Sequence, residues 1–270
     1  MRNPLISIII PTYNSGRVVE ECISSILTQT HQNFEVIISD GLSVDNTLDV
    51  LKRLALNDKR IKVFSEKDCG IYDAMNKGID HAAGDWLFFL GSDDRLFNES
   101  ILEEIFQSTE VTNYEVIYGN VEIHGDTSWA KDKDVYDGIF DKKKLTRKNI
   151  SHQSIFYRRD FIRNQIGYYN SDYTLYGDWD FNLRCRAKTE FLYINKIIAK
   201  FYSGGESTKT QIDQKFTDDF LRNVLCYFNI DAFDPLVNDI DFGFYEELLK
   251  LQKMQNYLKF TVGRVKRKLL

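Results

Sequence analysis

Short apolar runs alternate with amphipathic segments over the first hundred residues of the chain. Apolar runs of strand length lie at 5–11, 34–39, 61–65 and 86–90. Apolar side chains at helical spacing lie between them, at 18–27, 47–56 and 71–82. This alternation predicts a mostly parallel sheet whose crossover helices flank its faces. The sequence therefore predicts an α/β fold.

The later part of the chain carries fewer regular signals. Helical spacing at 101–106, apolar runs at 116–123 and 154–157, and a charged irregular stretch at 124–148 follow one another. We predict a helix, then a strand at 116–123, then a loop at 124–148. From residue 214 the pattern is helical, with one apolar stripe of Phe244, Leu248, Leu251 and Met254. These patterns predict one α/β domain over 1–212 and a C-terminal helical extension over 213–270.

Composition and charge are those of a globular protein. Of 270 residues, 43% are hydrophobic and 28% charged, which allows a sizeable core. The net charge of −5 argues against a nucleic-acid partner, because phosphate backbones are held by surplus Lys and Arg. The four cysteines have no zinc-binding spacing, which favours reduced thiols in the cytoplasm. We find neither a signal peptide nor an apolar stretch of about 18 residues, so we expect any membrane contact to be peripheral.

An acid pair follows the apolar run at 86–90. Gly91 and Ser92 let the backbone turn there and present Asp93 and Asp94 beyond the sheet. Paired carboxylates suit Mg²⁺ or Mn²⁺, which take one or two protein carboxylates together with substrate phosphates. A solvated turn or a helix cap is the alternative. Polar clusters follow three of the predicted strands, and ligands of open α/β sheets bind at that edge, so we expect one shared site.

Four motifs resemble those of the family-two glycosyltransferases of the GT-A fold. In order they are Ile8-Ile9-Ile10-Pro11-Thr12-Tyr13-Asn14, Ser24-Ser25-Ile26-Leu27-Thr28-Gln29-Thr30, Ser39-Asp40-Gly41 with Asp45 and Thr47, and Ser92-Asp93-Asp94. The stretch 66–85 resembles a bacterial branch that builds surface polysaccharides. The resemblance implies a metal-dependent, inverting glycosyltransferase of hexosyltransferase type that uses a nucleotide-sugar donor, expected to be a UDP-sugar. It also implies a donor-binding half over 1–100 and an acceptor half over 101–212.

The resemblance further implies a set of donor-site residues. They are Pro11, Thr12, Tyr13, Asn14, Asp40, Asp73, Asn76, Lys77, Ser92 and Asp93, with Asp93 and Asp94 holding Mn²⁺ or Mg²⁺. Tyr13 also offers a stacking platform for a base, worth about 1–3 kcal/mol. Alternatives stay open: Pro11 to Asn14 as an ordinary turn, Asp45 as a helix cap, and Asp73 with Lys77 as a surface salt bridge.

On the acceptor side the resemblance implies a general base. Asp178 is the aligned candidate and Asp180 the reserve, although Gly177 stands where the family often has Glu. Inverting transfer needs one carboxylate to accept the proton of the acceptor hydroxyl. His152 is expected near the diphosphate or the acceptor, and Gly204-Gly205 at a close backbone approach to ligand. A helix cap, a structural histidine and a plain turn are the respective alternatives.

Other whole-function hypotheses remain. A dehydrogenase or nucleotidyltransferase is disfavoured, because no Gly-rich phosphate loop follows the first predicted strand. A catalytically inactive nucleotide-sugar-binding module stays open. The basic, amphipathic segment 257–270 predicts either a peripheral membrane contact, which would serve a saccharide or lipid-linked saccharide acceptor, or a helix packed on the domain or on a homodimer partner.

Overall fold

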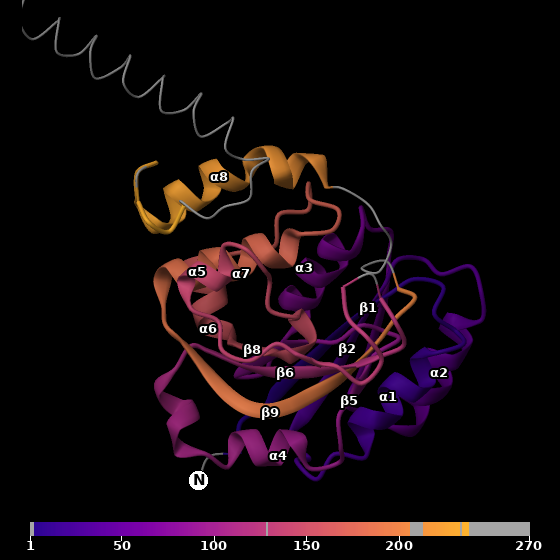
Figure 1. The fold of residues 1–270 in the computed structure, drawn as a ribbon. Helices are drawn as coiled ribbons and strands as arrows, with labels where there is room; N and C mark the ends of the chain where they lie inside the picture. Colours follow the sequence, from indigo (N-terminus) through magenta and orange to yellow (C-terminus); the bar gives the residue numbers. More distant parts are fainter. Residues whose placement is uncertain (1–2, 128, 206–212, 233, 238–270) are drawn as a thin grey trace, which may run out of the picture.

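The computed structural model describes residues 3–127, 129–205, 213–232 and 234–237. One sheet with helices on both faces forms the body of the molecule (Figure 1). Its strands are β1 Ile6–Thr12, β2 Phe34–Asp40, β3 Ile61–Ser65, β4 Trp86–Phe89, β5 Arg95–Leu96, β6 Val116–His124, β7 Val135–Tyr136, β8 Ile155–Arg158 and β9 Phe191–Tyr202. The order across the sheet is β3-β2-β1-β4-β8-β6-β9-β5, and β7 pairs with β6.

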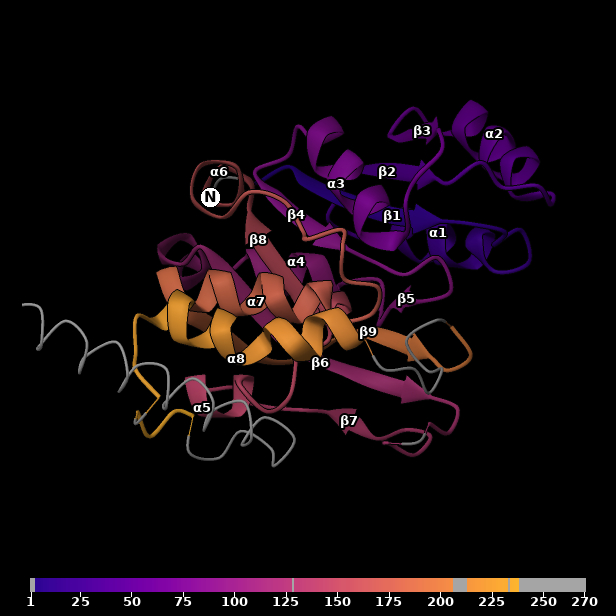
Figure 2. The same ribbon diagram turned by 90° about the horizontal axis from the view of Figure 1, so that it is seen from above.

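Helices cover both faces of this sheet. They are α1 Val19–Leu27, α2 Thr47–Asn57, α3 Ile71–His81, α4 Ile101–Phe106, α5 Lys142–Leu145, α6 Arg159–Phe161, α7 Gly177–Lys188 and α8 Gln214–Phe228, with short η helices at Thr109–Asn113, His152–Ser154 and Ile162–Ile166. Helices α1, α2 and α4 lie on one face and α3 and α7 on the other, with α8 beside α7 (Figures 1 and 2). No helix in these described stretches is both long and apolar enough to cross a bilayer.

The central strand β1 shows why these residues form a buried strand. Successive side chains of a strand point to opposite faces of its sheet. Ile8 and Ile10 accordingly join the core under α1 and α2, whereas Ile9 joins the core under α3. A strand covered on both faces needs a continuous apolar run, and all seven residues of β1 are buried.

Strand direction decides where the functional side chains meet. β3, β2, β1 and β4 are parallel, β8 runs antiparallel between β4 and β6, and β6 is parallel to β9. The carboxyl ends of β1, β2, β4, β6 and β9 therefore lie at one edge of the sheet. Ligands of open α/β sheets collect at this edge.

The structure confirms the predicted alternation of strands and helices in the first hundred residues. The sheet, predicted to be mostly parallel, is parallel over β3-β2-β1-β4 and over β6-β9, and the remaining pairings are antiparallel. The segment 124–148, predicted as a loop, is largely irregular in its described residues and also contains the two-residue strand β7 and the four-residue helix α5. The long strand β9 was not predicted. Helix α8 confirms the helical pattern from residue 214, whereas the stripe from Phe244 to Met254 and the segment 257–270 lie outside the described residues.

Candidate functional site

Three loops at the carboxyl edge of the sheet are tied to one another by polar contacts. The backbone N–H of Asn14, after β1, donates to the Ser43 hydroxyl, after β2, at 2.8 Å. The hydroxyls of Ser15 and Ser92 lie 2.8 Å apart, which joins the β1 loop to the β4 loop. Asn14 has a φ of 50°, a left-handed conformation that Asn tolerates better than most residues. These contacts bring the predicted motifs into one crevice.

Asp94 is buried at the end of β4. Its side chain is 2% exposed and accepts hydrogen bonds from the Tyr202 backbone N–H at 2.9 Å and the Gln153 side-chain amide at 2.6 Å. Burial, followed by the charge of Asp93, raises the pKa of Asp94 to about 7. Burial also raises the pKa of Asp93. Among the described residues, no Lys or Arg forms an ion pair with either carboxylate.

The loop after β9 packs directly on this acid pair. A Cβ on Gly205 would lie 2.8 Å from Asp93 Oδ2, a distance too short for a real side chain. Gly204 before it has a φ of +113°, which favours glycine. Gly204-Gly205 was predicted to make a close backbone approach to a ligand, and the structure shows the approach to Asp93 itself.

The acid pair fits a divalent cation that shares its coordination with a substrate. The residues described contain no group of three or more His, Cys, Asp or Glu side chains that could hold an ion alone. Mg²⁺ and similar ions, however, often bind through one or two carboxylates, waters and substrate phosphates. Two adjacent, partly desolvated acids without a cationic partner match that requirement. Asp93 and Asp94 therefore remain the residues that would hold the metal.

Asp178, in the first turn of α7, lies in a polar pocket of its own. Its Oδ2 accepts a hydrogen bond from the Asn149 amide at 2.7 Å, and its Oδ1 lies 3.1 Å from the Tyr72 hydroxyl. That hydroxyl also lies 2.6 Å from the Leu175 carbonyl. The N-cap of α7 is Tyr176, and the Asp178 side chain makes no cap hydrogen bond there. Asp178 is therefore not the N-cap of α7, which was the alternative role.

His152 links the two acidic centres. Its Nδ1 lies 3.7 Å from Asp178 Oδ2, and its Nε2 is buried and has no partner among the described residues. Its charge lowers the pKa of both Asp93 and Asp94, against the larger effect of burial. The structure thus places His152, predicted near the diphosphate or acceptor, beside Asp178 and close enough to the acid pair to lower the pKa of both acids.

Asp180 has a different environment from Asp178. Residues two apart on a helix point to nearly opposite sides, because each step turns about 100°. The Asp180 carboxylate is 2% exposed and pairs with Arg184 Nε at 2.9 Å. It also accepts from the Tyr227 hydroxyl at 2.8 Å and the Asn223 amide at 3.3 Å, both on α8. Asp180 therefore joins α7 to α8, and Asp178 stays the candidate base.

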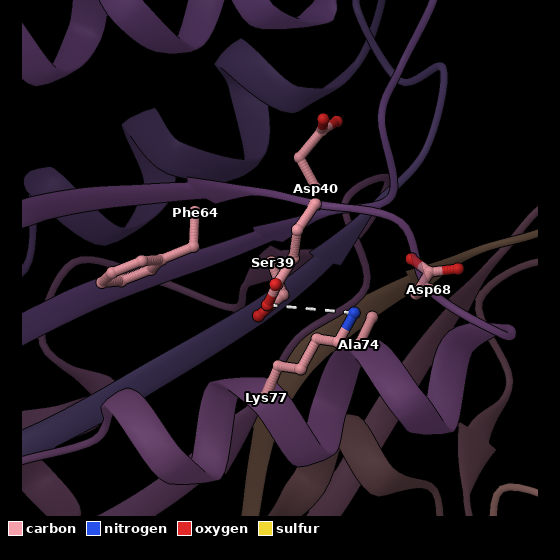
Figure 3. A pocket seen from close by; sticks show the side chains of 7 residues that line it. Ser39, Asp40, Phe64, Asp68, Ala74 and Lys77 are labelled. Carbon is pink, nitrogen blue, oxygen red and sulfur yellow. Dashed lines mark ion pairs between the residues drawn. The ribbon is translucent and has the colours of Figure 1, made fainter.

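A small pocket between β2 and α3 is lined by two of the predicted donor residues, Asp40 and Lys77 (Figure 3). It is lined by Ser39, Asp40, Phe64, Glu66, Asp68, Ala74 and Lys77. Ser39 faces α3, and its hydroxyl is buried without a partner in the described chain, whereas the Asp40 side chain points to the other side of β2 (Figure 3). Asp40 is 1% exposed and accepts hydrogen bonds from Ser43 and Ser65. Sequence reasoning named Asp40 and Lys77 but missed Ser39 and Phe64 as lining residues.

The residues of α3 are engaged with protein partners. Lys77 Nζ donates to the Lys67 carbonyl at 2.5 Å and lies 3.5 Å from Asp73 Oδ2, so the salt bridge left open as an alternative is present. Asp73 also accepts from the Cys69 N–H at 3.0 Å. The Asn76 amide exchanges two hydrogen bonds with the backbone of Tyr169, at 2.9 and 2.8 Å. Asn76 thus ties α3 to the chain near residue 169.

The remaining predicted donor residues lie along the β1 and β2 loops. Tyr13 is 61% exposed, while Pro11 and Thr12 are buried at the end of β1. Asp45 accepts hydrogen bonds from the Thr47 N–H at the start of α2 and from the Gly16 N–H at 3.2 Å. Asp45 therefore closes a turn just before α2 and holds the β1 loop, whereas the N-cap of α2 is Asn46 and not Asp45 as the alternative had it.

Comparison with known proteins places this arrangement in a protein family. The family described as "Glycosyl transferase family 2" matches residues 7–176. The PGL/p-HBAD biosynthesis glycosyltransferase of Mycobacterium tuberculosis is 38% identical over 221 residues, which cover 80% of this chain and 84% of that protein.

Two solved structures illustrate the likeness of the fold. TarS of S. aureus, solved in complex with UDP-GlcNAc, has a TM-score of 0.69 at 16% identity and is matched over 89% of this chain and 72% of that chain. The mannosyltransferase PcManGT of Pyrobaculum calidifontis, solved with GDP-Man and Mn²⁺, has a TM-score of 0.60 at 12% identity, over 96% and 81%. At these identities the likeness concerns the fold, and it confirms the expected GT-A fold.

We predict that Asp180 and Asp178 differ in what they do for stability. Asp180→Asn leaves Arg184 without its buried partner and should lower the free energy of unfolding by roughly 3 kcal/mol. Asp178→Asn weakens the hydrogen bond that the Asp178 carboxylate accepts from Asn149 and should lower the free energy of unfolding by about 1 kcal/mol. Urea unfolding followed by circular dichroism measures both. Equal losses would contradict the assignment of Asp180 as the structural residue.

We also predict that Asp94 makes the metal-free protein less stable as the pH rises. The raised pKa means that, between about pH 4 and about pH 7, the folded state holds a proton that the unfolded state has released. Wild-type stability should therefore fall by on the order of 1 kcal/mol per pH unit relative to Asp94→Asn. Urea unfolding in EDTA at about pH 5 and about pH 8 tests this difference. Asp160→Asn, at an exposed acid, is the control, and parallel curves for wild type and Asp94→Asn would refute the prediction.

Proposed function

The chain belongs to glycosyltransferase family 2, and we propose that it transfers a sugar from a UDP-sugar to an acceptor hydroxyl with inversion, using a divalent cation. The observation that carries this proposal is the acid pair at the carboxyl edge of the sheet, in which Asp94 is buried and Asp93 is partly desolvated. Burial of two acids without a cationic partner costs free energy, which a bound cation would offset. When bound there, Mn²⁺ or Mg²⁺ would neutralise charge on the leaving diphosphate.

The chain's own residues would bind the nucleotide along the carboxyl edge of the sheet, next to the small pocket between β2 and α3. Tyr13, exposed at the end of β1, offers its ring to the base. The partnerless hydroxyl of Ser39 offers a hydrogen bond inside the pocket, and Lys77 supplies positive charge at its rim. We choose uridine as the base because the neighbour TarS was solved with UDP-GlcNAc, at the higher of the two TM-scores.

Asp178 would act as general base on the acceptor. A single carboxylate that takes the proton of the acceptor hydroxyl suffices for inversion, because no covalent intermediate forms. Its Oδ2 faces Asn149 and its Oδ1 faces Tyr72, so the carboxylate is held in place without a paired Lys or Arg among its described contacts. His152 lies between Asp178 and the acid pair, where a ligand bridging the two centres would meet its partnerless Nε2.

The acceptor would be a saccharide or lipid-linked saccharide of the cell surface. The mycobacterial relative is described as a biosynthesis glycosyltransferase, and the segment 66–85 resembles the branch that builds surface polysaccharides. We place the enzyme in the cytoplasm, at the inner face of the membrane, through the basic segment 257–270. This location follows from the sequence of that segment alone, since it lies outside the described residues.

We predict that Asp94→Ala abolishes metal-dependent release of UDP from a UDP-sugar and leaves the fold intact. The physical reason is the loss of one of two cation ligands at the leaving group. In wild type, thermal shift with UDP should grow when Mn²⁺ is added, and this increment should vanish in Asp94→Ala. Metal-dependent turnover at the wild-type rate in the variant would defeat the metal assignment.

The same screen tests the donor. Uridine, guanosine, adenosine and cytidine diphosphates are compared by thermal shift, each with and without Mn²⁺. A stabilisation confined to UDP is expected. A shift confined to GDP would replace uridine by guanosine and leave the acid-pair assignment standing.

A further inference from the structure

A chain of hydrogen bonds leads from the protein core to the carboxylate of Asp178. The Tyr157 hydroxyl, on β8, donates to Asn182 Oδ1 at 2.7 Å. The Asn182 amide, on α7, donates to Asn149 Oδ1 at 2.8 Å. The Asn149 amide in turn donates to Asp178 Oδ2 at 2.7 Å. This series of hydrogen bonds therefore joins β8, α7 and the segment at Asn149, and it ends at Asp178 Oδ2.

The carboxylate of Asp178 determines the donor-to-acceptor direction of these hydrogen bonds. An ionised carboxylate only accepts hydrogen bonds, so Asn149 must present its NH₂ group to Asp178 and its oxygen to Asn182. Asn182 must then present its own NH₂ group to Asn149 and its oxygen to Tyr157. The Tyr157 hydroxyl can only donate there. Burial raises the pKa of Tyr157, which keeps this hydroxyl protonated.

The residues at the other end of this series of hydrogen bonds, Tyr157 and Asn182, are tightly packed in the core. Tyr157 and Asn182 are both 0% exposed, and the Tyr157 ring packs edge-on against Phe89 and Phe181 at 6.1 and 5.4 Å between centroids. Reversing the Asn182 amide in this setting would leave buried polar atoms without partners, which costs about 1–3 kcal/mol.

Asn149 is also held through its backbone. Its carbonyl accepts a hydrogen bond from the Tyr136 hydroxyl, on β7, at 2.6 Å. Side chain and backbone together thus give Asn149 three fixed partners, Tyr136, Asn182 and Asp178. The titratable groups that face Asp178 from the other elements are Tyr72 on α3 and His152 before β8. Tyr136, Tyr157 and Tyr169 lie close enough for its charge to raise their pKa values.

We propose that Asn149, set by Asn182 and Tyr157, is a positioning residue that aims the ionised carboxylate of Asp178 at the acceptor. This inference rests on the proposed role of Asp178 as general base. Donation from Asn149 favours the charged form of the base and fixes which oxygen stays available. A displacement of about 1 Å in a reacting group costs up to about 100-fold in rate, so this aim matters for turnover.

The test compares Asn149→Ala and Tyr157→Phe with Tyr173→Phe. The control, Tyr173→Phe, removes another buried tyrosine hydroxyl. This hydroxyl bonds to Asp219 and Asn223 and takes no part in the series of hydrogen bonds that leads to Asp178. Crystal structures of all three variants report the orientation of the Asp178 carboxylate. We expect it to rotate in Asn149→Ala, to lose a single orientation in Tyr157→Phe, and to stay in place in Tyr173→Phe.

Hydrolysis of UDP-N-acetylglucosamine with Mn²⁺ supplies the kinetic readout. We expect kcat to fall about tenfold in Asn149→Ala while KM for the donor changes less than about twofold. The acidic limb of the pH profile should move to higher pH, since the charged base has lost a donor. Asn149→Asp should move it further, because a second carboxylate would face the first.

An Asp178 carboxylate that keeps its wild-type orientation in Asn149→Ala would overturn the proposal, as would an unchanged pH profile. Asp178→Ala, run alongside, separates this failure from that of the proposed function. Wild-type hydrolysis in Asp178→Ala would remove the base assignment, and with it this inference. Loss of hydrolysis in Asp178→Ala together with an unaffected Asn149→Ala would remove only the inference.

Discussion

The desolvation of two neighbouring carboxylates is the constraint around which the rest of the structure is arranged. Asp94 is almost fully buried and Asp93 lies beside it, so their charges repel in a medium that screens them poorly. The fold supplies partial compensation through hydrogen bonds from Gln153 and from the Tyr202 backbone. The compensation is incomplete, because burial still holds the pKa of Asp94 at about 7. A cation bound beside these two carboxylates would supply the positive charge that the described residues do not provide.

The sheet topology explains how distant segments reach that pair. Because β8 runs antiparallel between β4 and β6, the strands β6 and β9 point in the same direction as β1 and β4. The loop after β9 therefore arrives at the same edge as the loop after β4. Gly205 makes the final contact with Asp93, where any side chain would collide. One antiparallel strand thus decides that residues more than a hundred positions apart share a site.

Sequence patterns predicted the features that depend on local order. The run Ile6–Ile10 and the acid pair after β4 are readable because apolar periodicity and polar strand ends are local signals. Strand β9 was missed, since its charged and aromatic residues show neither a buried run nor clean alternation. Asn149 and Tyr72 were not named as contacts of Asp178 because their partners lie 29 and 106 residues away. No local pattern marks an amide whose partner is set by tertiary packing.

Helix α7 shows how one element separates stability from chemistry. Asp180 turns toward α8 and is satisfied by Arg184, Tyr227 and Asn223, a set of partners that fixes the helix. Asp178, two residues earlier, faces the other way. Among the described residues it forms no ion pair with a Lys or Arg, and the imidazole of His152 lies 3.7 Å away. A fully paired carboxylate would be a poor base, because its lone pairs and charge would be committed. The ion pair of Asp180 with Arg184 therefore anchors the helix that presents Asp178, the proposed base, without a Lys or Arg partner among the described residues.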